Sequence, residues 1–250
     1  MREIGVAVQL FSVRDACACD LPGTLGAVAQ MGYEGVEFAG HYNRSAMELR
    51  RLLADLGLKV AGSHIGWDAL AGNELDRTMD FNEELGNVHL ICPGLPEERR
   101  SSIDAWKETA HLMNAMAEIT EKRGMRVGYH NHSVEFQSLE DQIPWDVFLQ
   151  ETTASVVMQL DTGNAMHGGG DVLSILKRYP GRATTIHFKE YSRDHEQALL
   201  GEGEVPWQEV FGLCQDRQDT CWYIVEQETY AYPPLKCIEL CLKNLKRLLG

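Results

Sequence analysis

Ionisable side chains stand at the ends of four apolar segments in the second half of the chain. They are His130, Asp161, His187 and Glu226. Imidazole nitrogens and carboxylate oxygens together suit a divalent cation such as Mn²⁺, Co²⁺, Fe²⁺, Ni²⁺ or Zn²⁺. Two nitrogens and two oxygens without a thiolate argue against a structural zinc and predict an open catalytic site. A hydrogen-bonded polar group is the alternative for any one residue, but the recurrence at four segment ends favours a metal site.

The neighbours of these residues repeat an alternating pattern. Residues two apart in a strand share a face, so His130 and His132 are expected to point the same way. The same spacing relates Gln159 to Asp161 and His187 to Lys189. The four segments must therefore be brought side by side for their polar ends to converge.

The chain contains eight apolar, β-branched runs, and each is followed by a segment of helical period. These are the elements that could bring the four segments side by side. Strands are expected at residues 4–11, 35–38, 59–64, 88–92, 126–130, 156–161, 184–188 and 222–226. Helices are expected at residues 21–31, 45–56, 73–85, 101–123, 144–151, 171–179, 206–216 and 234–249. Unbroken alternation predicts a parallel sheet, and eight units in 250 residues predict an α/β fold, a closed (β/α)8 TIM barrel. We expect a single domain over residues 1–250, with its active site at the carboxyl ends of the strands.

An open doubly wound sheet is the alternative fold. It would usually show a glycine-rich phosphate turn after its first strand, and Phe11-Ser12-Val13-Arg14-Asp15 is no such turn. The run Gly168-Gly169-Gly170 is not a phosphate loop either, because the following Lys-Ser/Thr of that motif is missing. The closed barrel is therefore preferred.

The composition excludes several classes of function. Lys and Arg total 23 against 37 Asp and Glu, and the net charge of −14 would repel a nucleic-acid backbone. Apolar runs stay short of the ~20 residues needed to cross a membrane. Met1 leads directly into a short predicted strand, without a signal peptide. The seven cysteines are scattered along the chain, which predicts free thiols in a reducing compartment. We expect a cytoplasmic protein that binds neither nucleic acid nor membrane.

Motifs over nearly the whole chain resemble those of one family. They are Val8-Gln9-Leu10-Phe11-Ser12-Val13-Arg14-Asp15, Gly32-Tyr33-Glu34-Gly35-Val36-Glu37-Phe38, Tyr129-His130-Asn131-His132, Leu160-Asp161-Thr162-Gly163-Asn164, His187-Phe188-Lys189 and Gly201-Glu202-Gly203-Glu204-Val205-Pro206-Trp207. The chain resembles the xylose-isomerase-like TIM barrels, and within them the sugar phosphate isomerase/epimerase group. That group also contains inosose dehydratases, hydroxypyruvate isomerases and ketose 3-epimerases. The motifs are specific for the superfamily and much less specific for the reaction.

The resemblance implies one Mn²⁺-like ion held at the ends of strands five to eight. By position its ligands become His130, Asp161, His187 and Glu226, and the strand-five ligand could instead be His132. The departure is His130, where the epimerases keep a glutamate that also acts as acid and base. Glu226 is then the expected base, with His132 or Glu135 as the second proton-transfer group.

Further residues are expected to contact substrate or to assist the chemistry. His64 resembles a residue that contacts substrate hydroxyls, although a rim histidine bonded to backbone is an equal alternative. Glu37 is expected within reach of substrate or of His64. Lys189 could bind a phosphate or polarise a carbonyl, or pair with Glu190 or Glu228. The remaining expected substrate contacts are Trp67, Phe11 and Asn164, and the two aromatic residues could equally be plain packing.

The main hypothesis is an isomerase or epimerase that removes a proton beside the carbonyl of a keto-sugar, phosphorylated or not, or of a cyclitol. A divalent metal would stabilise the resulting enediolate. Loss of a β-hydroxyl or glycosyl group from the same enediolate would make the protein a dehydratase or lyase, of the inosose dehydratase or 3-keto-glycoside type. A small-molecule partner is expected in either case, in a homodimer or a homotetramer.

Two further hypotheses are weaker. Metal-dependent apurinic endonucleases share this barrel, and Asp194-His195 follows strand seven, where they use additional ligands. They also need a histidine three residues after the strand-six aspartate, where this chain has Asn164. A non-catalytic sugar-binding barrel is disfavoured only by the apparent completeness of the metal ligand set.

Overall fold

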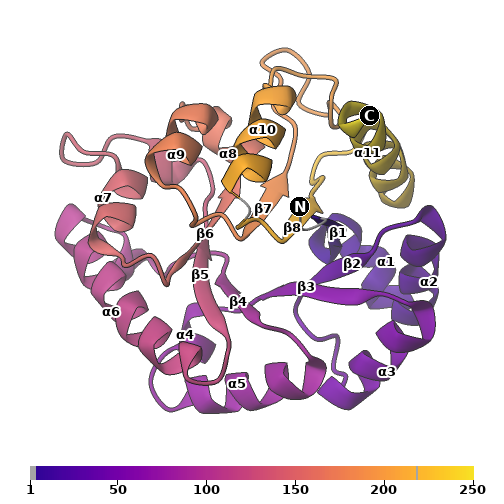
Figure 1. Cartoon of the computed structure of the whole chain (residues 1–250), viewed down its shortest axis with the longest axis horizontal. Helices are drawn as coiled ribbons and strands as arrows, with labels where there is room; N and C mark the ends of the chain where they lie inside the picture. The colour runs from indigo at the N-terminus through magenta and orange to yellow at the C-terminus, as the bar shows by residue number, and fades with distance from the viewer. Residues whose placement is uncertain (1–3, 218) are drawn as a thin grey trace.

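The computed structural model describes residues 4–217 and 219–250, so Met1, which leads into the first predicted strand, lies outside the described residues. Eight parallel strands form a closed barrel in sequence order, with β1 paired to both β2 and β8 (Figure 1). The strands are β1 Gly5–Gln9, β2 Gly35–Ala39, β3 Lys59–His64, β4 His89–Cys92, β5 Arg126–His130, β6 Val157–Asp161, β7 Thr185–Phe188 and β8 Trp222–Val225. The predicted TIM barrel is confirmed.

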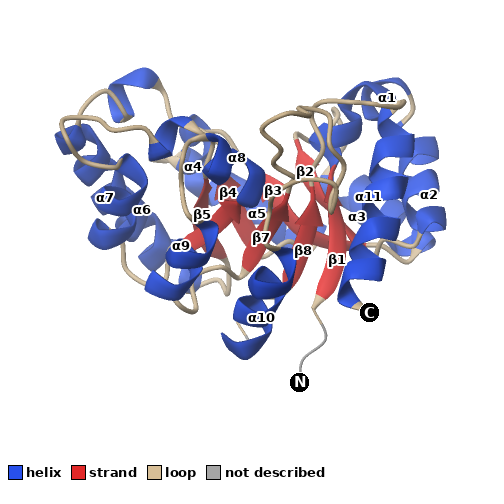
Figure 2. Ribbon diagram, turned by 90° about the horizontal axis from the view of Figure 1, so that it is seen from above, coloured by secondary structure: helices blue, strands red, loops and turns tan. Residues whose placement is uncertain are grey.

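Helices surround the strands on the outside of the barrel (Figures 1 and 2). The larger ones are α2 Leu21–Met31, α3 Ala46–Leu56, α5 Glu74–Leu85, α6 Ile103–Glu121, α7 Pro144–Glu151, α9 Val172–Arg178, α10 Trp207–Arg217 and α11 Pro234–Leu249. Local sequence explains their ends. The Ser45 hydroxyl and the Glu48 carboxylate form a capping box at the start of α3, and Gly57 ends that helix with a φ of 69°.

Short helices that the sequence did not predict follow several strands. They are η1 Leu10–Val13, α1 Arg14–Cys19, α4 Trp67–Leu70, η2 Glu97–Arg99, η3 Val134–Phe136 and α8 Thr162–His167. The first strand was predicted to continue to Phe11, but it ends at Gln9, whose side chain accepts a hydrogen bond from the Phe11 backbone and caps η1. Leu10 and Val13 are buried in this turn, so their apolar character did not distinguish it from strand.

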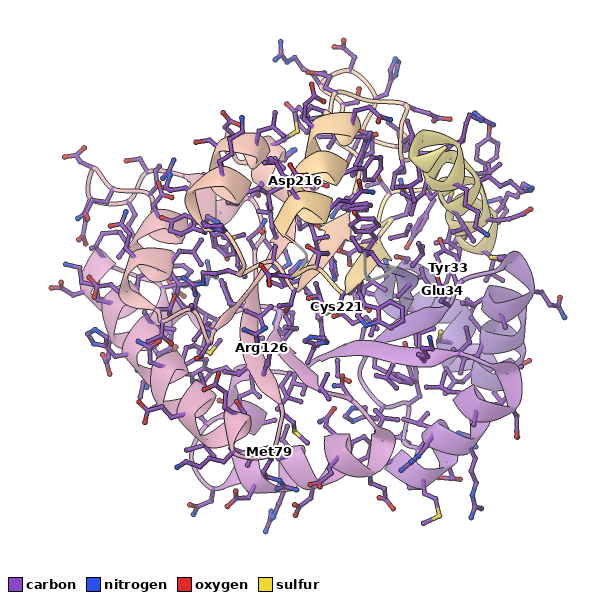
Figure 3. All side chains as sticks on the ribbon, in the orientation of Figure 1. Tyr33, Glu34, Met79, Arg126, Asp216 and Cys221 are labelled. Atoms are coloured by element: carbon purple, nitrogen blue, oxygen red, sulfur yellow. The ribbon has the colours of Figure 1, made fainter. Side chains whose placement is uncertain are left out.

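Side chains fill the space between the barrel and its ring of helices (Figure 3). Aromatic rings from α6, β5 and α7 pack edge to face there, with Trp106 and Tyr129 centroids 5.9 Å apart. Inside the barrel, Ala7, Ala61 and Ile224 form a separate small apolar cluster. Because strand side chains alternate with period two, Ala7 is followed on the same face by Gln9, and Ile224 by Glu226. The interior therefore changes from apolar to polar toward the carboxyl ends of the strands.

Two properties of the surface and the thiols follow from the described residues. None of the helices over 4–217 and 219–250 combines the length and apolar character that crossing a bilayer requires. The seven cysteines are all free, and only Cys19 is exposed.

Candidate active site

Four buried side chains converge at the carboxyl end of the barrel. His130 and Asp161 end strands β5 and β6, His187 is the last residue but one of β7, and Glu226 directly follows β8. One ligand atom from each lies within 4.8 Å of all the others. Nδ1 of His130 and Oδ2 of Asp161 are buried without a hydrogen-bond partner. Buried polar atoms are normally satisfied, so two unpartnered polar atoms in one cluster fit a site for a divalent cation.

The Asp161 carboxylate is held so that one oxygen remains free. Its Oδ1 accepts a 2.6 Å hydrogen bond from the backbone N–H of Asn164 and caps α8. The Asn131 side chain fixes the Asp161 backbone, accepting from its N–H at 2.8 Å and donating to its carbonyl at 3.2 Å. Burial raises the pKa of Asp161 to about 7, and Lys189 opposes that rise.

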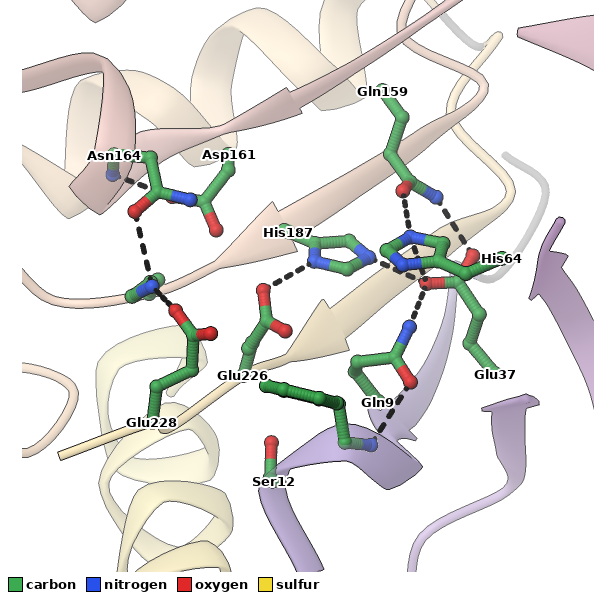
Figure 4. Close-up of polar contacts among 12 residues, drawn as sticks. Gln9, Ser12, Glu37, His64, Gln159, Asp161, Asn164, His187, Glu226 and Glu228 are labelled. Carbon is green, nitrogen blue, oxygen red and sulfur yellow. Dashed lines mark hydrogen bonds and ion pairs between the residues drawn. The ribbon is translucent and has the colours of Figure 1, made fainter. Parts of the chain in front are cut away.

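His187 lies between two carboxylates (Figure 4). Its Nδ1 is 2.9 Å from Oε2 of Glu226, and its Nε2 is 2.6 Å from Oε2 of Glu37. Burial disfavours the charged ring, but Glu37 and Glu226 outweigh burial and raise the pKa of His187 to about 10. Burial likewise opposes ionisation of Glu226, yet His187 and Lys189 lower its pKa to about 2. The pair is therefore an imidazolium and a carboxylate at neutral pH.

Glu37 is the centre of a buried polar layer on the side of His187 opposite Glu226 (Figure 4). Its Oε2 accepts from Nε2 of Gln9 at 2.7 Å, and its Oε1 accepts from Nε2 of Gln159 at 2.8 Å. Gln159 also donates to the Thr185 hydroxyl and lies 2.8 Å from Nε2 of His64. Despite the unfavourable effect of burial, His64 and His187 hold the pKa of Glu37 well below its usual range. With no exposed surface, Glu37 has the surroundings of an orienting group.

Histidine rings form one wall of the pocket above the cluster. The His64 and His187 rings are stacked with centroids 5.3 Å apart, and His130 lies 4.5 Å from His187 and 5.1 Å from His132. Burial and the neighbouring His187 lower the pKa of His130 well below its ordinary value. A neutral imidazole with a free Nδ1 is the form that binds a metal.

The pocket itself has a volume of about 340 Å³, within the range of small-molecule sites. Its lining includes Phe11, His64, His130, His132, Glu226 and Glu228. Phe11 is 39% exposed and stands beneath the guanidinium of Arg14, 4.4 Å from its ring centroid. The opening thus combines one aromatic face with imidazole and carboxylate groups, which suits a small polar ligand with an apolar face.

Lys189 and Asn164 lie beside this pocket rather than in its lining. Nζ of Lys189 forms an ion pair with Glu228 and donates to Oδ1 of Asn164 at 3.0 Å. The pairing with Glu228 was one of the alternatives predicted for Lys189. Burial lowers the pKa of this ammonium, but Asp161 and Glu226 outweigh it and raise the pKa above its ordinary value. The positive charge of Lys189 therefore persists next to the carboxyl groups of Asp161 and Glu226.

The structure places Glu135 and Trp67 away from the pocket lining. Glu135 accepts from the Tyr129 hydroxyl at 2.7 Å and from the His132 backbone N–H at 2.8 Å, so both of its oxygens are engaged. Trp67 begins α4 and is buried, with the Arg99 guanidinium 5.7 Å from its ring centroid. Glu135 therefore shapes the connection between β5 and α7, and Trp67 is a packing residue.

Sequence reasoning assigned no role to Gln9 and Asn131. Gln9 could have been found from its strand, because it lies two residues after Ala7 on the inner face. Asn131 carried no comparable signal, since its contact with Asp161 joins residues 30 apart. Asp194 and His195 belong to neither of the two clusters among the described residues that could hold an ion.

Comparisons with known proteins show which sequences and folds this chain is similar to. The chain is 25% identical to an inosose dehydratase of Geobacillus kaustophilus (strain HTA426) over 258 aligned positions, covering 84% of this chain and 83% of that enzyme. A sugar phosphate isomerase/epimerase from Parabacteroides distasonis superposes with a TM-score of 0.83 at 23% identity, covering 98% of this chain and 94% of that one. D-allulose 3-epimerase from Methylomonas sp. in complex with D-allulose superposes with a TM-score of 0.72 at 13% identity, covering 99% and 98%.

The two superpositions show the shared fold. A family sequence model described as xylose isomerase-like TIM barrel matches residues 25–247, which is most of the chain and includes all four residues of the cluster. The chain belongs to the xylose isomerase-like TIM barrel family.

Proposed function

We propose that this protein is a divalent-metal-dependent isomerase or epimerase that moves a proton beside the carbonyl of a keto-sugar or cyclitol. The observation that carries the proposal is the buried cluster in which His130 Nδ1 and Asp161 Oδ2 lack partners beside a ligand-sized pocket. The similarity to named sugar isomerases, epimerases and an inosose dehydratase supports it. An enzyme of this type needs a cation site and a base that face the same small pocket, and the four clustered residues, with Glu226 in the pocket lining, could supply both.

The cation would be held by His130, Asp161, His187 and Glu226. When bound, it supplies Lewis-acid polarisation of a carbonyl and its adjacent hydroxyl, and so makes the neighbouring C–H more acidic. Glu37 orients His187 through the Nε2 hydrogen bond, which leaves Nδ1 as the nitrogen that faces the cluster. We propose manganese or a similar divalent ion, because the donor set mixes imidazole with carboxylate.

Glu226 is the proposed base. It lines the pocket, and its lowered pKa keeps the carboxylate ionised at neutral pH and ready to accept a proton from carbon. His132 lines the same pocket and is the proposed second group, which donates a proton to the product carbon or oxygen. Glu135 was the other candidate for this second role. It is less suitable, because both of its oxygens already accept hydrogen bonds.

The sides of the pocket are the proposed substrate contacts. His64 is directed at the pocket from β3 and Phe11 offers its ring at the mouth. Asn164 holds the Lys189 ammonium beside Glu228, at the edge of the same region. Lys189 in this position provides a fixed positive charge that favours the build-up of negative charge on substrate oxygens.

A dehydratase is the second candidate, and the identity with an inosose dehydratase favours it. The first step is the same removal of a proton from the carbon beside the carbonyl. The electron pair then expels a β-hydroxyl, which leaves as water after receiving a proton from His132. A cytoplasmic location, the homodimer or homotetramer and the absence of nucleic-acid binding remain predictions.

One experiment tests the proposal and separates its two forms. Metal-free protein is reloaded with Mn²⁺, Co²⁺ or Zn²⁺ and incubated in D₂O with a panel of keto-sugars and inososes, and NMR follows the hydrogen beside the carbonyl. We expect metal-dependent deuterium uptake into at least one compound. A product that keeps all its oxygens establishes an isomerase or epimerase, and a product that has lost water establishes a dehydratase. No exchange with any compound or metal would contradict both forms.

A further inference from the structure

A second cavity adjoins the pocket above the cluster. It has a volume of about 590 Å³, larger than the 340 Å³ of the first. The Glu228 side chain lines both cavities, and its ion pair with Lys189 lies at their boundary. In Figure 4, Glu228 and Asn164 stand on the side of Glu226 that faces away from His64. A molecule that reaches past Glu228 would thus enter the second cavity from the first.

The second cavity is built as a fixed surface. Its outer wall is the connection between β7 and α10, and the Glu190 carboxylate ties that connection together. Glu190 accepts from the backbone N–H groups of Gly201 at 2.6 Å and Val205 at 3.2 Å, and from Nε1 of Trp207 at 2.8 Å. A Cβ at Gly203 would approach the Tyr191 carbonyl oxygen to 2.2 Å, so only glycine fits this close packing. The wall is therefore held in one shape without a ligand.

The polar groups of this cavity match hydroxyls. Hydroxyl and amide side chains of Ser133, Asn164, Ser192 and Thr229 line it. Asn164 already bonds Lys189 and the Asn131 carbonyl, but the Ser192 hydroxyl, which accepts from His195 N–H, can still donate, and the Thr229 hydroxyl, which donates to the Glu196 carbonyl, can still accept. One flat face is provided by His167, whose ring is 6.3 Å from that of Tyr191 in an edge-on arrangement. Hydroxyl-rich rings need alternating polar contacts and such an apolar face, so the lining fits an oligohydroxylated group.

The charges of the two cavities disfavour a phosphate. Among the described residues that line the first cavity there is neither a lysine nor an arginine. The second cavity has two cations, Lys189 and Arg193, but four carboxylates line it, and Lys189 is already paired with one of them. The carboxylates are Glu190, Asp194, Glu196 and Glu228. A dianion would meet net negative charge, whereas an uncharged group would not.

We propose that the second cavity is a subsite for an uncharged, hydroxyl-rich unit, so that the substrate is a two-unit compound such as a keto-disaccharide or another keto-glycoside without phosphate. The unit that reacts lies in the first cavity, and its substituent passes Glu228 into the second. This inference rests on the proposed function for the identity of the reacting unit, but its binding prediction stands apart from catalysis.

The test is direct binding of unreactive sugars to the full-length, Mn²⁺-loaded protein by titration calorimetry. The probes are glucose, myo-inositol and glucose 6-phosphate as single units, and maltose, cellobiose and trehalose as double units. We expect at least one disaccharide to bind about tenfold more tightly than glucose, the gain typical of several added polar contacts. Glucose 6-phosphate should bind no more tightly than glucose. A preference for the phosphate, or equal affinities for one and two units, would overturn the proposal.

Two variants test whether the higher affinity for a disaccharide comes from the second cavity. Ser192→Trp fills the second cavity and should cancel the advantage of the disaccharide while leaving the affinity for glucose unchanged. His167→Ala removes the flat face and should reduce the same advantage in part. Ser101→Trp, which adds the same ring at an exposed position before α6, is the matched control and should change neither affinity. Equal loss of both affinities in Ser192→Trp would contradict the subsite.

The sugar-binding experiment and the deuterium-exchange experiment can fail independently of each other. Tight binding of a disaccharide without solvent deuterium exchange in any keto-compound would overturn the reaction and retain the subsite. Exchange in a single-unit keto-sugar, with no preference for two units in binding, would retain the reaction and overturn the subsite.

Discussion

Oε2 of Glu37 lies 2.6 Å from Nε2 of His187, on the side of the ring opposite Glu226. Glu37 belongs to β2 and His187 to β7, so the barrel itself brings together residues 150 apart in sequence. A metal-binding histidine usually donates its other N–H to a carboxylate, which fixes the ring and increases its basicity. The contact therefore makes Glu37 a positioning residue for His187.

The first prediction follows from this contact. Glu37→Gln should weaken Mn²⁺ binding by about 10- to 100-fold, the usual loss when an outer-shell partner of a metal ligand is removed. Calorimetric titration of the metal-free variant measures the change. Glu239→Gln, which removes a surface carboxylate of α11 paired with Lys236 and Lys243, should bind Mn²⁺ as the wild type does. Equal affinities in wild type and Glu37→Gln would show that the contact does not support a metal ligand.

Removal of a ligand should have a larger effect. Asp161→Ala and His187→Ala should each lose the metal on dialysis, while circular dichroism shows an intact fold because these rim residues lie outside the main apolar core. Metal content by emission spectrometry is the measurement. Wild type and both variants with the same metal content would mean that the four side chains form a structural polar network.

His130 tests which residue of the strand-five end binds the ion. Its Nδ1 is buried and unpartnered, whereas His132 lies at the pocket wall. His130→Glu should retain Mn²⁺, because a carboxylate supplies an equivalent oxygen donor, and His130→Ala should not. Retention of metal by both His130 variants, together with loss of metal in His132→Ala, would transfer the role to His132.

Metal affinity should increase with pH. In the metal-free protein the pKa of Asp161 is raised to about 7 and that of His187 to about 10, so near neutral pH His187 is protonated and Asp161 about half protonated, and a bound cation must displace these protons. Raising the pH removes the competing protons, and each proton released adds up to about tenfold in affinity per pH unit. Calorimetry in buffers of different ionisation enthalpy counts the protons released. An affinity that stays constant or falls between roughly pH 6 and 8 would contradict these pKa shifts.

The sequence predicted most of the fold because each strand and large helix carried its own local signal. Capping residues such as Ser45 and stop glycines such as Gly57 fixed helix ends to within a residue or two. The short helices η1, α4 and α8 were missed, since their buried residues have no period long enough to distinguish them from strand or loop.

The clustering of His130, Asp161, His187 and Glu226 was predictable from the sequence, and the contacts that support them were much less so. The position of His130, Asp161 and His187 at or near the ends of their predicted strands indicates one common rim of the barrel. The carboxylate of Glu37 beneath His187, and the second cavity beyond Glu228, depend on how strands and loops far apart in sequence close around the barrel. No local sequence pattern indicates which residues far apart in the chain will come into contact.

The most direct test of the central claim is solvent exchange in Glu226→Gln. The variant keeps an oxygen donor for the cation but cannot accept a proton, so at saturating Mn²⁺ it should bind metal while deuterium uptake from D₂O falls by ~10² to 10⁴-fold, the usual loss for a general base. NMR of the substrate found in the panel measures the uptake, and metal content of the same samples is the control. Metal-loaded Glu226→Gln that exchanges its substrate hydrogen at the wild-type rate would contradict the account.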